Sequence, residues 1–363
     1  MWRAAFAIGV VAVVACRSHT TAPTRAELEE SLRLCDAYLA GQQMPSGNFV
    51  YTYDWVARRA LTEQNPVRQA SGAWGAALAY QFQPTPEMRK VVETALAYFE
   101  SHDDPKDFLG VTALLALAEI DYARASEPAV RAAHKPALDR MLQTLLDARR
   151  PDGLFSPRGN LAEPSPYFDG EALLALAKAA RYLGRTDLRP VIVESALAMR
   201  ERHIVKALRD NADSDDTKGF YQWSSMAFYE LSQTGWPELA SLASTVVELG
   251  DWVLDRHHVV GRQRNTGYAV EGLVHAYLAA TNLGDTAHAA KFREAIETML
   301  ARLMTWQVGG PRPNSFIRDH EADKTAIGGV QNEEDDPALR IDVTLHQMHA
   351  IMLALSAFYP DAH

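Results

Sequence analysis

The chain has 363 residues, of which 47% are hydrophobic and 23% are charged, as in an ordinary globular protein. This length fits one large domain or two smaller ones. The formal net charge of -10 argues against a general nucleic-acid-binding protein, because only a local basic patch would offset repulsion by the phosphates. The sequence contains no long run of Lys and Arg, so we expect no nucleic-acid partner.

The first residues have the pattern of an export signal. Arg3 precedes an apolar run over residues 4–15, and about 12 apolar residues are too few to span a bilayer comfortably. The run ends in VVAC, which resembles a bacterial lipoprotein signal, in which Cys16 becomes the lipidated first residue of the mature chain. We therefore expect a signal peptide over 1–16, a tether over 17–24 and a protein anchored by lipid in the bacterial cell envelope, on the periplasmic or extracytoplasmic face. A signal peptide cleaved nearby without lipidation, or an uncleaved anchor, also fits.

Only Cys35 remains if Cys16 carries lipid. An exported chain with one free cysteine has no internal disulfide, so its stability must come from burial of a large core.

Helical patterns dominate the rest of the chain and alternate between two kinds. Six stretches are rich in Ala and Leu and carry little charge, which is typical of helices buried on most sides: 71–82, 108–123, 169–184, 221–235, 268–284 and 341–358. Six others are amphipathic and charged, which is typical of helices with one face in water: 25–40, 86–101, 127–149, 187–207, 237–257 and 286–304.

Six buried helices paired with six outer helices predict an all-α fold, an (α/α)6 toroid in which six helical hairpins form two concentric rings. This single domain is expected to cover residues 25–363. An open solenoid of the HEAT or TPR kind is the structural alternative. Strand patterns are scarce, and 48–55 is the best candidate for one arm of a short β-hairpin in a long loop.

The connections between these helices differ in length. Those leading from an outer helix into the next inner helix are often long, at 41–69, 150–168, 208–220, 257–267 and 305–340, whereas the return connections are mostly short turns. In a toroid the long loops gather on one face, at the N-terminal ends of the inner helices. Long loops in a compact domain usually carry function, so we expect the binding site on this face.

The aromatic and polar side chains in and beside these loops are of the kinds that bind sugars. Tyr and Trp rings stack on the C–H faces of pyranose rings, while Arg and carboxylate groups bond hydroxyls. The expected substrate-binding residues are Tyr51, Tyr53, Arg68, Gln69, Trp74, Tyr167, Tyr221, Trp223, Tyr268, Arg340 and His346. For any single aromatic residue, simple packing of its loop is the alternative.

Four carboxylates lie near the start of predicted inner helices and are the catalytic candidates: Asp342, Glu271, Asp169 and Glu171. Hydrolysis of a glycosidic bond needs one protonated acid and one base or nucleophile, and pairs drawn from these four can supply them. Helix capping is the alternative for each. Asp342 has a further alternative, an ion pair with Arg340 or Arg68 that is structural or binds an anionic substrate.

Asp342, His346 and His349 fall on one face of the last predicted helix. Two of them could meet one metal ion, but three ligands on successive turns spread over about 10 Å, too far for one ion. We therefore expect no metal and no other cofactor. His346, nearer the helix start, is expected to bind substrate or transfer a proton, and His349 to be a hydrogen-bonded core residue.

The chain resembles the six-hairpin (α/α)6 toroid superfamily, which contains many glycoside hydrolases and the N-acylglucosamine 2-epimerase-like proteins. The resemblance rests on the twelve-helix alternation and on inner-helix openings such as YFDGEALLALAKAARYLGR and NTGYAVEGLVHAYLAA. It implies a carbohydrate-active domain that acts on a glycan or another small polar ligand in the central cavity, by hydrolysis, lyase chemistry or epimerisation. The resemblance does not specify one activity, because one fold hosts many reactions. The sequence has no catalytic signature of one glycosidase family, so no catalytic residue follows from the resemblance.

Two other classes of function stay open. The same cavity could serve a lipoprotein that binds a glycan or peptide without catalysis. A terpene cyclase or prenyltransferase-like toroid is disfavoured, because the acidic stretch DSDD at 213–216 lies in a predicted loop and is expected to be a solvated turn.

Overall fold

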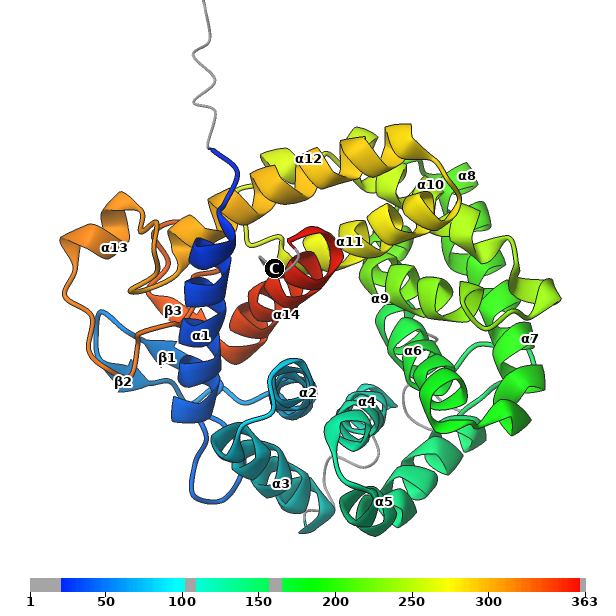
Figure 1. Cartoon of the computed structure of the whole chain (residues 1–363), viewed down its shortest axis with the longest axis horizontal. Coiled ribbons are helices and arrows are strands. Elements are labelled where there is room, and N and C mark those ends of the chain that lie inside the picture. Colours follow the sequence, from blue (N-terminus) through cyan, green and yellow to red (C-terminus); the bar gives the residue numbers. More distant parts are fainter. Residues whose placement is uncertain (1–20, 102–108, 157–164, 360–363) are drawn as a thin grey trace, which may run out of the picture.

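The computed structural model describes residues 21–101, 109–156 and 165–359. Its helices form two concentric rings, with inner and outer helices alternating along the chain (Figure 1). The inner helices are α2 (Pro66–Phe82), α4 (Leu109–Ala125), α6 (Pro166–Leu183), α9 (Asp215–Ser232), α11 (Gly267–Asn282) and α14 (Ile341–Phe358). The outer helices are α1 (Arg25–Gly41), α3 (Pro86–Ser101), α5 (Pro128–Asp147), α7 (Arg189–Arg200) with the short α8 (Ala207–Asp210), α10 (Leu242–Asp255) and α12 (Thr286–Leu303).

The inner ring is closed. Each inner helix packs against the next one along the chain, and α14 packs against α2. An open solenoid has no contact between its first and last repeats. The structure therefore confirms the predicted all-α (α/α)6 toroid.

Side-chain pattern explains which helices lie inside. In α4 every residue from Leu109 to Ala123 is buried, because this helix is covered on all sides. In α3 the buried residues recur at the helical period and form one stripe, whereas the other face carries charges. The sequence contrast between Ala- and Leu-rich stretches and amphipathic, charged stretches therefore predicts correctly which helices form the inner ring and which form the outer ring.

Two inner helices, α2 and α9, begin five and six residues earlier than predicted, and both differences concern the long-loop face. Asn65 caps α2 by accepting the backbone N–H of Arg68, and Pro66 occupies the first helical turn. Ser214 caps α9 by accepting two backbone N–H groups. Arg68 and Lys218 therefore lie in first helical turns rather than in loops.

The outer segment predicted as one helix over 187–207 contains a change of helical type. After α7 the chain continues as a π-helical segment, Glu201–Lys206, before α8. His203 lies in this wider turn and is buried between Asp169 and Asp216, with 2.8 Å and 3.1 Å between ring nitrogens and carboxylate oxygens. Such π-helical turns are rare in proteins and occur frequently at functional sites.

A small sheet joins the first and last long loops. Strand β1 (Thr52–Asp54) pairs antiparallel with β2 (Arg59–Ala60) and with β3 (Ala338–Arg340), in the order β2-β1-β3. The segment 48–55 thus does form one arm of a hairpin. The last loop also contains α13 (Ser315–Asp319). Because β3 leads directly into α14, the sheet fixes the start of that helix beside α2.

Within the described ranges, α14 is the one helix long and apolar enough to cross a membrane, and 78% of that stretch is buried in the ring. Such burial is typical of the core helix of a folded domain. The predicted signal peptide and Cys16 lie outside the described residues.

Gly170 allows α6 and α9 to approach closely at the wall of the site. A Cβ atom at this position would overlap the Cβ atom of Trp223. We expect Gly170→Ala to lower the free energy of unfolding by about 1–3 kcal/mol, the usual cost of overpacking a core. Urea denaturation measures the change. Gly41→Ala is the control, because nothing lies within 4 Å of a Cβ atom there, and an equal loss in both variants would contradict this account.

Candidate active site

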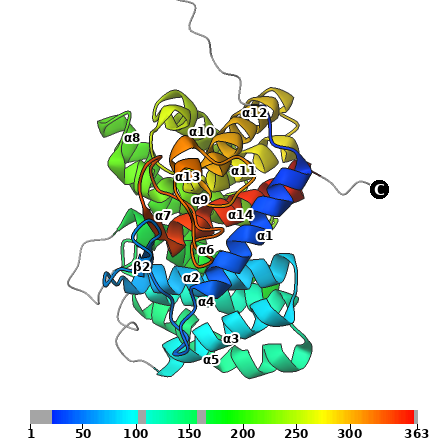
Figure 2. The same cartoon turned by 90° about the vertical axis from the view of Figure 1, so that its left-hand side faces the viewer.

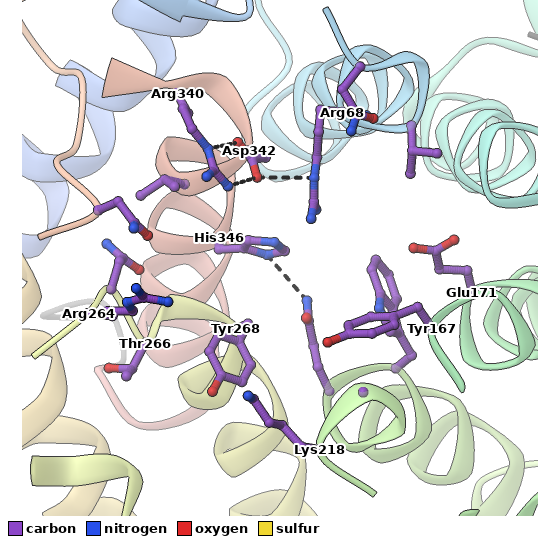
Figure 3. Close-up of a pocket in the computed structure, with 18 of the residues that line it drawn as sticks. Arg68, Tyr167, Glu171, Lys218, Arg264, Thr266, Tyr268, Arg340, Asp342 and His346 are labelled. Carbon is purple, nitrogen blue, oxygen red and sulfur yellow. Dashed lines mark hydrogen bonds and ion pairs between the residues drawn. The ribbon is translucent and has the colours of Figure 1, made fainter. Parts of the chain in front are cut away.

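A pocket of about 810 Å³ opens on the long-loop face, where the inner helices begin (Figure 3). Such a volume suits a small ligand or a few sugar units. The predicted site residues that line it are Arg68, Tyr167, Glu171, Trp223, Tyr268, Arg340, Asp342 and His346. Arg340 is the last residue of the short strand β3, and the others come from α2, α6, α9, α11 and α14, so five of the inner helices contribute.

Glu171 is a buried carboxyl group on the part of the pocket wall that α6 provides. Its Oε2 is buried and has no hydrogen-bond partner among the described residues. This oxygen and the Phe168 ring lie against Gly110, where a Cβ atom would meet both. Burial raises the pKa of Glu171 to about 8, although the positive charge of Arg68 lowers it in part. Glu171 is therefore protonated at neutral pH.

Asp342 lies on another wall and has the opposite environment. Arg340 donates two hydrogen bonds to it, Nε to Oδ1 at 3.0 Å and Nη2 to Oδ2 at 2.6 Å. Arg68 Nε lies 3.3 Å from Oδ2. Burial alone would raise the pKa of Asp342, but these arginines outweigh it and hold the pKa below its usual value. Asp342 is therefore ionised. The sequence suggested an ion pair with Arg340 or with Arg68, and the structure shows both.

The two carboxyl groups thus share one pocket in different protonation states. Figure 3 shows Glu171 and Asp342 on different walls, with the side chain of Arg68 between them. Titratable pairs whose environments push their pKa values apart are the usual basis for assigning an acid and a base. This arrangement can donate a proton from one side of a bound ligand and present a negative charge on another.

Glu271 lies beneath the pocket and is wholly buried. It accepts hydrogen bonds from Gln222 Nε2, from His346 Nδ1 at 3.1 Å and from His349 Nδ1 at 2.8 Å. Burial favours its neutral form, but the two histidines outweigh burial and lower the pKa of Glu271. Glu271 therefore orients the imidazole of His346, which lines the pocket, and has no direct access to a ligand. His349 is a buried, hydrogen-bonded residue, as predicted.

Asp169 also lies away from the pocket wall, two residues before Glu171. Its Oδ1 accepts the backbone N–H of Phe155 at 2.7 Å, and its Oδ2 pairs with His203. The first bond holds Phe155 against α6, and the second joins α6 to the π-helical segment. The structure gives Asp169 a structural position.

Trp74 and Tyr221 are core residues in this structure. Trp74 Nε1 donates to Asp121 Oδ2 at 2.9 Å, and the Tyr221 hydroxyl donates to the carbonyl of Ala269 at 3.2 Å. Both side chains are almost fully buried. A buried aromatic ring with a satisfied polar atom cannot stack on a ligand in the pocket.

The remaining predicted binding residues hold the first long loop. Gln69 exchanges two hydrogen bonds of 2.8 Å with the backbone of Phe49, and the Tyr53 hydroxyl donates to Asp323. Tyr51 is buried behind the pocket wall, with the Arg340 guanidinium 5.9 Å from its ring centroid. Tyr51, Tyr53 and Gln69 therefore support the wall without lining it.

The structure adds wall residues that the sequence reasoning missed. Lys218, Gln222, Asn65 and Asn332 line the pocket. Lys218 was missed because α9 was predicted to begin at residue 221, which left Lys218 in a loop. The signal was present, since Ser214 followed by two aspartates is a typical helix start.

The stretch DSDD is more ordered than predicted. Asp213 pairs with His257 at 2.6 Å, Asp216 pairs with His203, and Ser214 caps α9. Two of its three carboxylates are thus partners of buried histidines, and none lines the pocket. Within the described ranges, no group of three or more His, Cys, Asp and Glu side chains is placed to hold a metal ion.

No known protein-family model matches the chain, and no curated protein matches it by sequence. Solved structures do match its fold. The α-1,6-mannanase of Salegentibacter sp. HEL1_6 is 9% identical with a TM-score of 0.67, and the match covers 91% of this chain and 99% of that one. The unsaturated glucuronyl hydrolase of Bacillus sp. GL1 is 15% identical with a TM-score of 0.66, covering 92% and 97%. A sugar epimerase from a ruminal bacterium is 12% identical with a TM-score of 0.63, covering 93% and 100%.

These matches extend over nearly the whole of each chain, and at such low identity they establish the fold alone. The protein therefore has the (α/α)6 toroid fold shared by these glycosidase-like and epimerase-like structures.

Proposed function

We propose that this protein is a lipid-anchored enzyme of the bacterial cell envelope that hydrolyses an acidic glycan in its toroid pocket. Glu171 is the general acid and Asp342 is the ionised partner. The anchor is a lipid on Cys16, which follows an apolar signal-like segment. The observation that carries the catalytic part is the contrast between a buried, protonated Glu171 and an arginine-paired, ionised Asp342 in the same pocket.

The two groups divide the chemistry of hydrolysis between them. The Glu171 carboxyl donates its proton to the glycosidic oxygen as the bond from that oxygen to the anomeric carbon breaks. Asp342 stabilises the positive charge that develops on the sugar ring and accepts a proton from the water that attacks the anomeric carbon. The products are a sugar hemiacetal and a free hydroxyl, and the proton taken by Asp342 returns to Glu171 through solvent.

The positively charged side chains of the pocket wall favour the binding of an anionic substrate. Five cationic side chains line the pocket, namely Arg68, Lys218, Arg262, Arg264 and Arg340, and Asp342 is the ionised carboxylate among the lining residues, while Arg264 also pairs with Glu333 outside the lining. Guanidinium groups bind carboxylates with two parallel hydrogen bonds. A sugar that carries a carboxylate, such as a uronate, fits this excess of positive charge.

Aromatic side chains provide the surface for the sugar ring. Tyr167, Trp223 and Tyr268 line the pocket, and Tyr167 is 49% exposed. An exposed ring beside polar groups is available for stacking against C–H bonds of a pyranose. The similar structures agree with this substrate class, since their names describe a mannanase, a glucuronyl hydrolase and a sugar epimerase.

A second candidate, binding without catalysis, is favoured by one observation. Both oxygens of Asp342 already accept hydrogen bonds from Arg340, and a carboxylate held in this way is a weak base. In that case the pocket binds an acidic glycan and releases it unchanged.

The two candidates are separated by a screen of acidic and neutral oligosaccharides with the full chain, in which binding and release of reducing ends are measured on the same samples. Hydrolysis by the parent protein that is lost in Glu171→Gln, with binding retained, supports the enzyme. Binding in both proteins without any release of reducing ends supports the binding protein.

Lys218 offers a test of the substrate class. Its side chain is partly exposed on the wall, and its nearest carboxylate, that of Asp215, is 3.8 Å away and open to solvent. We expect Lys218→Gln to raise KM for a uronate-containing oligosaccharide about twofold to fivefold with little change in kcat, because an exposed charge contributes modestly to binding. Lys206→Gln, at an exposed position away from the pocket, is the control. An equal change of KM for neutral sugars would contradict recognition of a carboxylate.

A further inference from the structure

The pocket opens on the face of the toroid that carries β2, opposite the end of α14 (Figure 2), and two of its five cations are paired with a carboxylate of the wall. Asp342 accepts hydrogen bonds from Arg340 at 3.0 Å and 2.6 Å, and its Oδ2 lies 3.3 Å from Arg68 Nε. An anionic group of a ligand at either arginine would lie beside the ionised Asp342, and like charges at such distances repel. Arg68 and Arg340 are therefore poor partners for a substrate anion.

Arg264 is the third cation of the wall with a carboxylate partner, because its Nε lies 2.9 Å from Glu333 Oε1. Its side chain is largely exposed, and exposed charges are screened by water and salt. Of the five cations that line the pocket, Arg262 and Lys218 remain.

Arg262 is held in place by neutral groups. Its Nε and Nη2 donate to the backbone carbonyl of His257, both at 3.4 Å, and Nη2 lies 3.1 Å from the imidazole Nδ1. That imidazole is buried, stacks on Trp252 with 5.0 Å between ring centroids, and bonds to Asp213 at 2.6 Å. Burial lowers the pKa of His257 despite the opposing effect of Asp213, so the ring is neutral at pH 7. Arg262 forms no ion pair with a described residue, so its position is fixed and no carboxylate of the described chain contacts its guanidinium.

Lys218 has no close partner either. Its Nζ is 3.8 Å from Asp215 Oδ1, which is longer than a hydrogen bond, and the Asp215 side chain is 98% exposed. Water and salt screen such an exposed pair. The ammonium group of Lys218 is therefore available to an anion in the pocket.

Arg262 and Lys218 lie on one side of the pocket. Besides burial, the positive charges of both side chains lower the pKa of His257, which places the two cations near one imidazole. Figure 3 shows Lys218 beside Tyr268 and across the pocket from Asp342. We call Arg262 and Lys218 the anion subsite.

We infer that the anion subsite binds the anionic group of an acidic sugar, a carboxylate or a sulfate, whereas Arg68 and Arg340 hold Asp342. This assignment rests on the acidic glycan of the proposed function. A guanidinium binds a carboxylate through two parallel hydrogen bonds, and the ammonium group adds a second positive charge. The anionic group then lies across the pocket from Asp342, where the ionised carboxylate repels it least.

The test measures the dissociation constants of D-glucuronate, D-glucose 6-sulfate and D-glucose with the full chain, by calorimetry at low salt and pH 7. We expect at least one of the two anions to bind about tenfold more tightly than glucose, because charge-assisted hydrogen bonds add about this much to affinity. The anion that binds more tightly identifies the group as a carboxylate or a sulfate. Arg262→Gln should remove most of this preference, and Lys218→Gln should reduce it about twofold to fivefold.

Two further variants separate loss of charge from a disturbed loop. Arg262→Lys keeps a positive charge beside His257 and should retain part of the preference for the anion. Arg256→Gln is the matched control, because Arg256 is an exposed arginine at the end of α10 that does not line the pocket.

Equal binding of glucose and both anions by the parent protein would overturn the anion subsite. A preference that survives the double variant Arg262→Gln with Lys218→Gln would also overturn it, and loss of that preference in Arg68→Gln would then place the anion beside Asp342. Release of reducing ends in the oligosaccharide screen separates the two proposals. Turnover with a preference that does not depend on Arg262 and Lys218 overturns the subsite alone, and a preference that depends on them without any turnover overturns the enzyme alone.

Discussion

Glu171→Gln is expected to lower kcat on an acidic glycan by about 10²- to 10⁴-fold, the usual contribution of a general acid. The amide keeps the shape of the side chain but has no proton to donate at neutral pH. Binding should stay within a few-fold of the parent, because the arginines and aromatic residues of the wall are unchanged. Steady-state kinetics together with calorimetric binding measure both quantities.

The same substitution is expected to make the protein more stable at neutral and alkaline pH. The pKa of Glu171 is raised from 4.5 to about 8 in the folded state, so between these values the folded protein holds a proton that the unfolded chain releases. Folding stability therefore falls by about 1.4 kcal/mol for each pH unit from 4.5 to 8 on account of this group. Glutamine removes that loss. Urea denaturation at pH 5 and pH 8 should show a gain for the variant at pH 8 and little gain at pH 5.

Glu194→Gln is the matched control, because Glu194 is exposed and pairs with Arg149 away from the pocket. It should leave both activity and the pH dependence of stability unchanged. Full activity of Glu171→Gln, or a loss of stability at pH 8, would show that Glu171 is a structural residue.

Glu271→Ala is expected to lower the free energy of unfolding by about 3–5 kcal/mol, the usual result of removing one partner from a buried ionic network. The substitution leaves Gln222, His346 and His349 without their shared acceptor beneath the pocket. It also releases the imidazole of His346 on the pocket wall. Urea denaturation at pH 7 measures the loss.

The contribution of Glu271 to the free energy of unfolding is expected to depend on pH. The pKa of Glu271 is lowered in the folded state, so its contribution to stability is present above its unfolded pKa of about 4.5 and is lost as the pH falls through the lower folded value. Glu271→Gln, which keeps the shape and removes the charge, should flatten the decline of stability below pH 4.5. A loss of less than 1 kcal/mol for Glu271→Ala would contradict the assignment of Glu271 as the residue that positions His346.

The ring of helices could be predicted from the sequence because the burial of each helix depends on its content of apolar and charged residues. The Ala- and Leu-rich stretches form the inner helices, and the amphipathic stretches form the outer helices. The bounds of α14 and α3 are the same as the predicted ranges. The starts of α2 and α9 were placed too late, since the polar residues of a first helical turn resemble those of a loop. The π-helical segment around His203 has no signal in the hydrophobic period.

The roles within the site could not be predicted from the sequence. Asp169 and Glu171 lie two residues apart at the start of α6, yet one pairs with His203 and the other lines the pocket. Glu271 is the fifth residue of α11 and Asp342 is the second residue of α14, and only Asp342 reaches the cavity. The difference depends on partners from distant parts of the chain, such as Arg68 for Asp342 and His349 for Glu271.

The most direct test of the account is a ¹³C NMR titration of the glutamate and aspartate side chains, with Glu171→Gln and Asp342→Asn used to assign the two signals. We expect Glu171 to titrate near pH 8 and Asp342 to titrate below the usual range of aspartate. Titration of both groups between pH 4 and 5 would contradict it, because the pocket would then hold two ionised carboxylates and no acid.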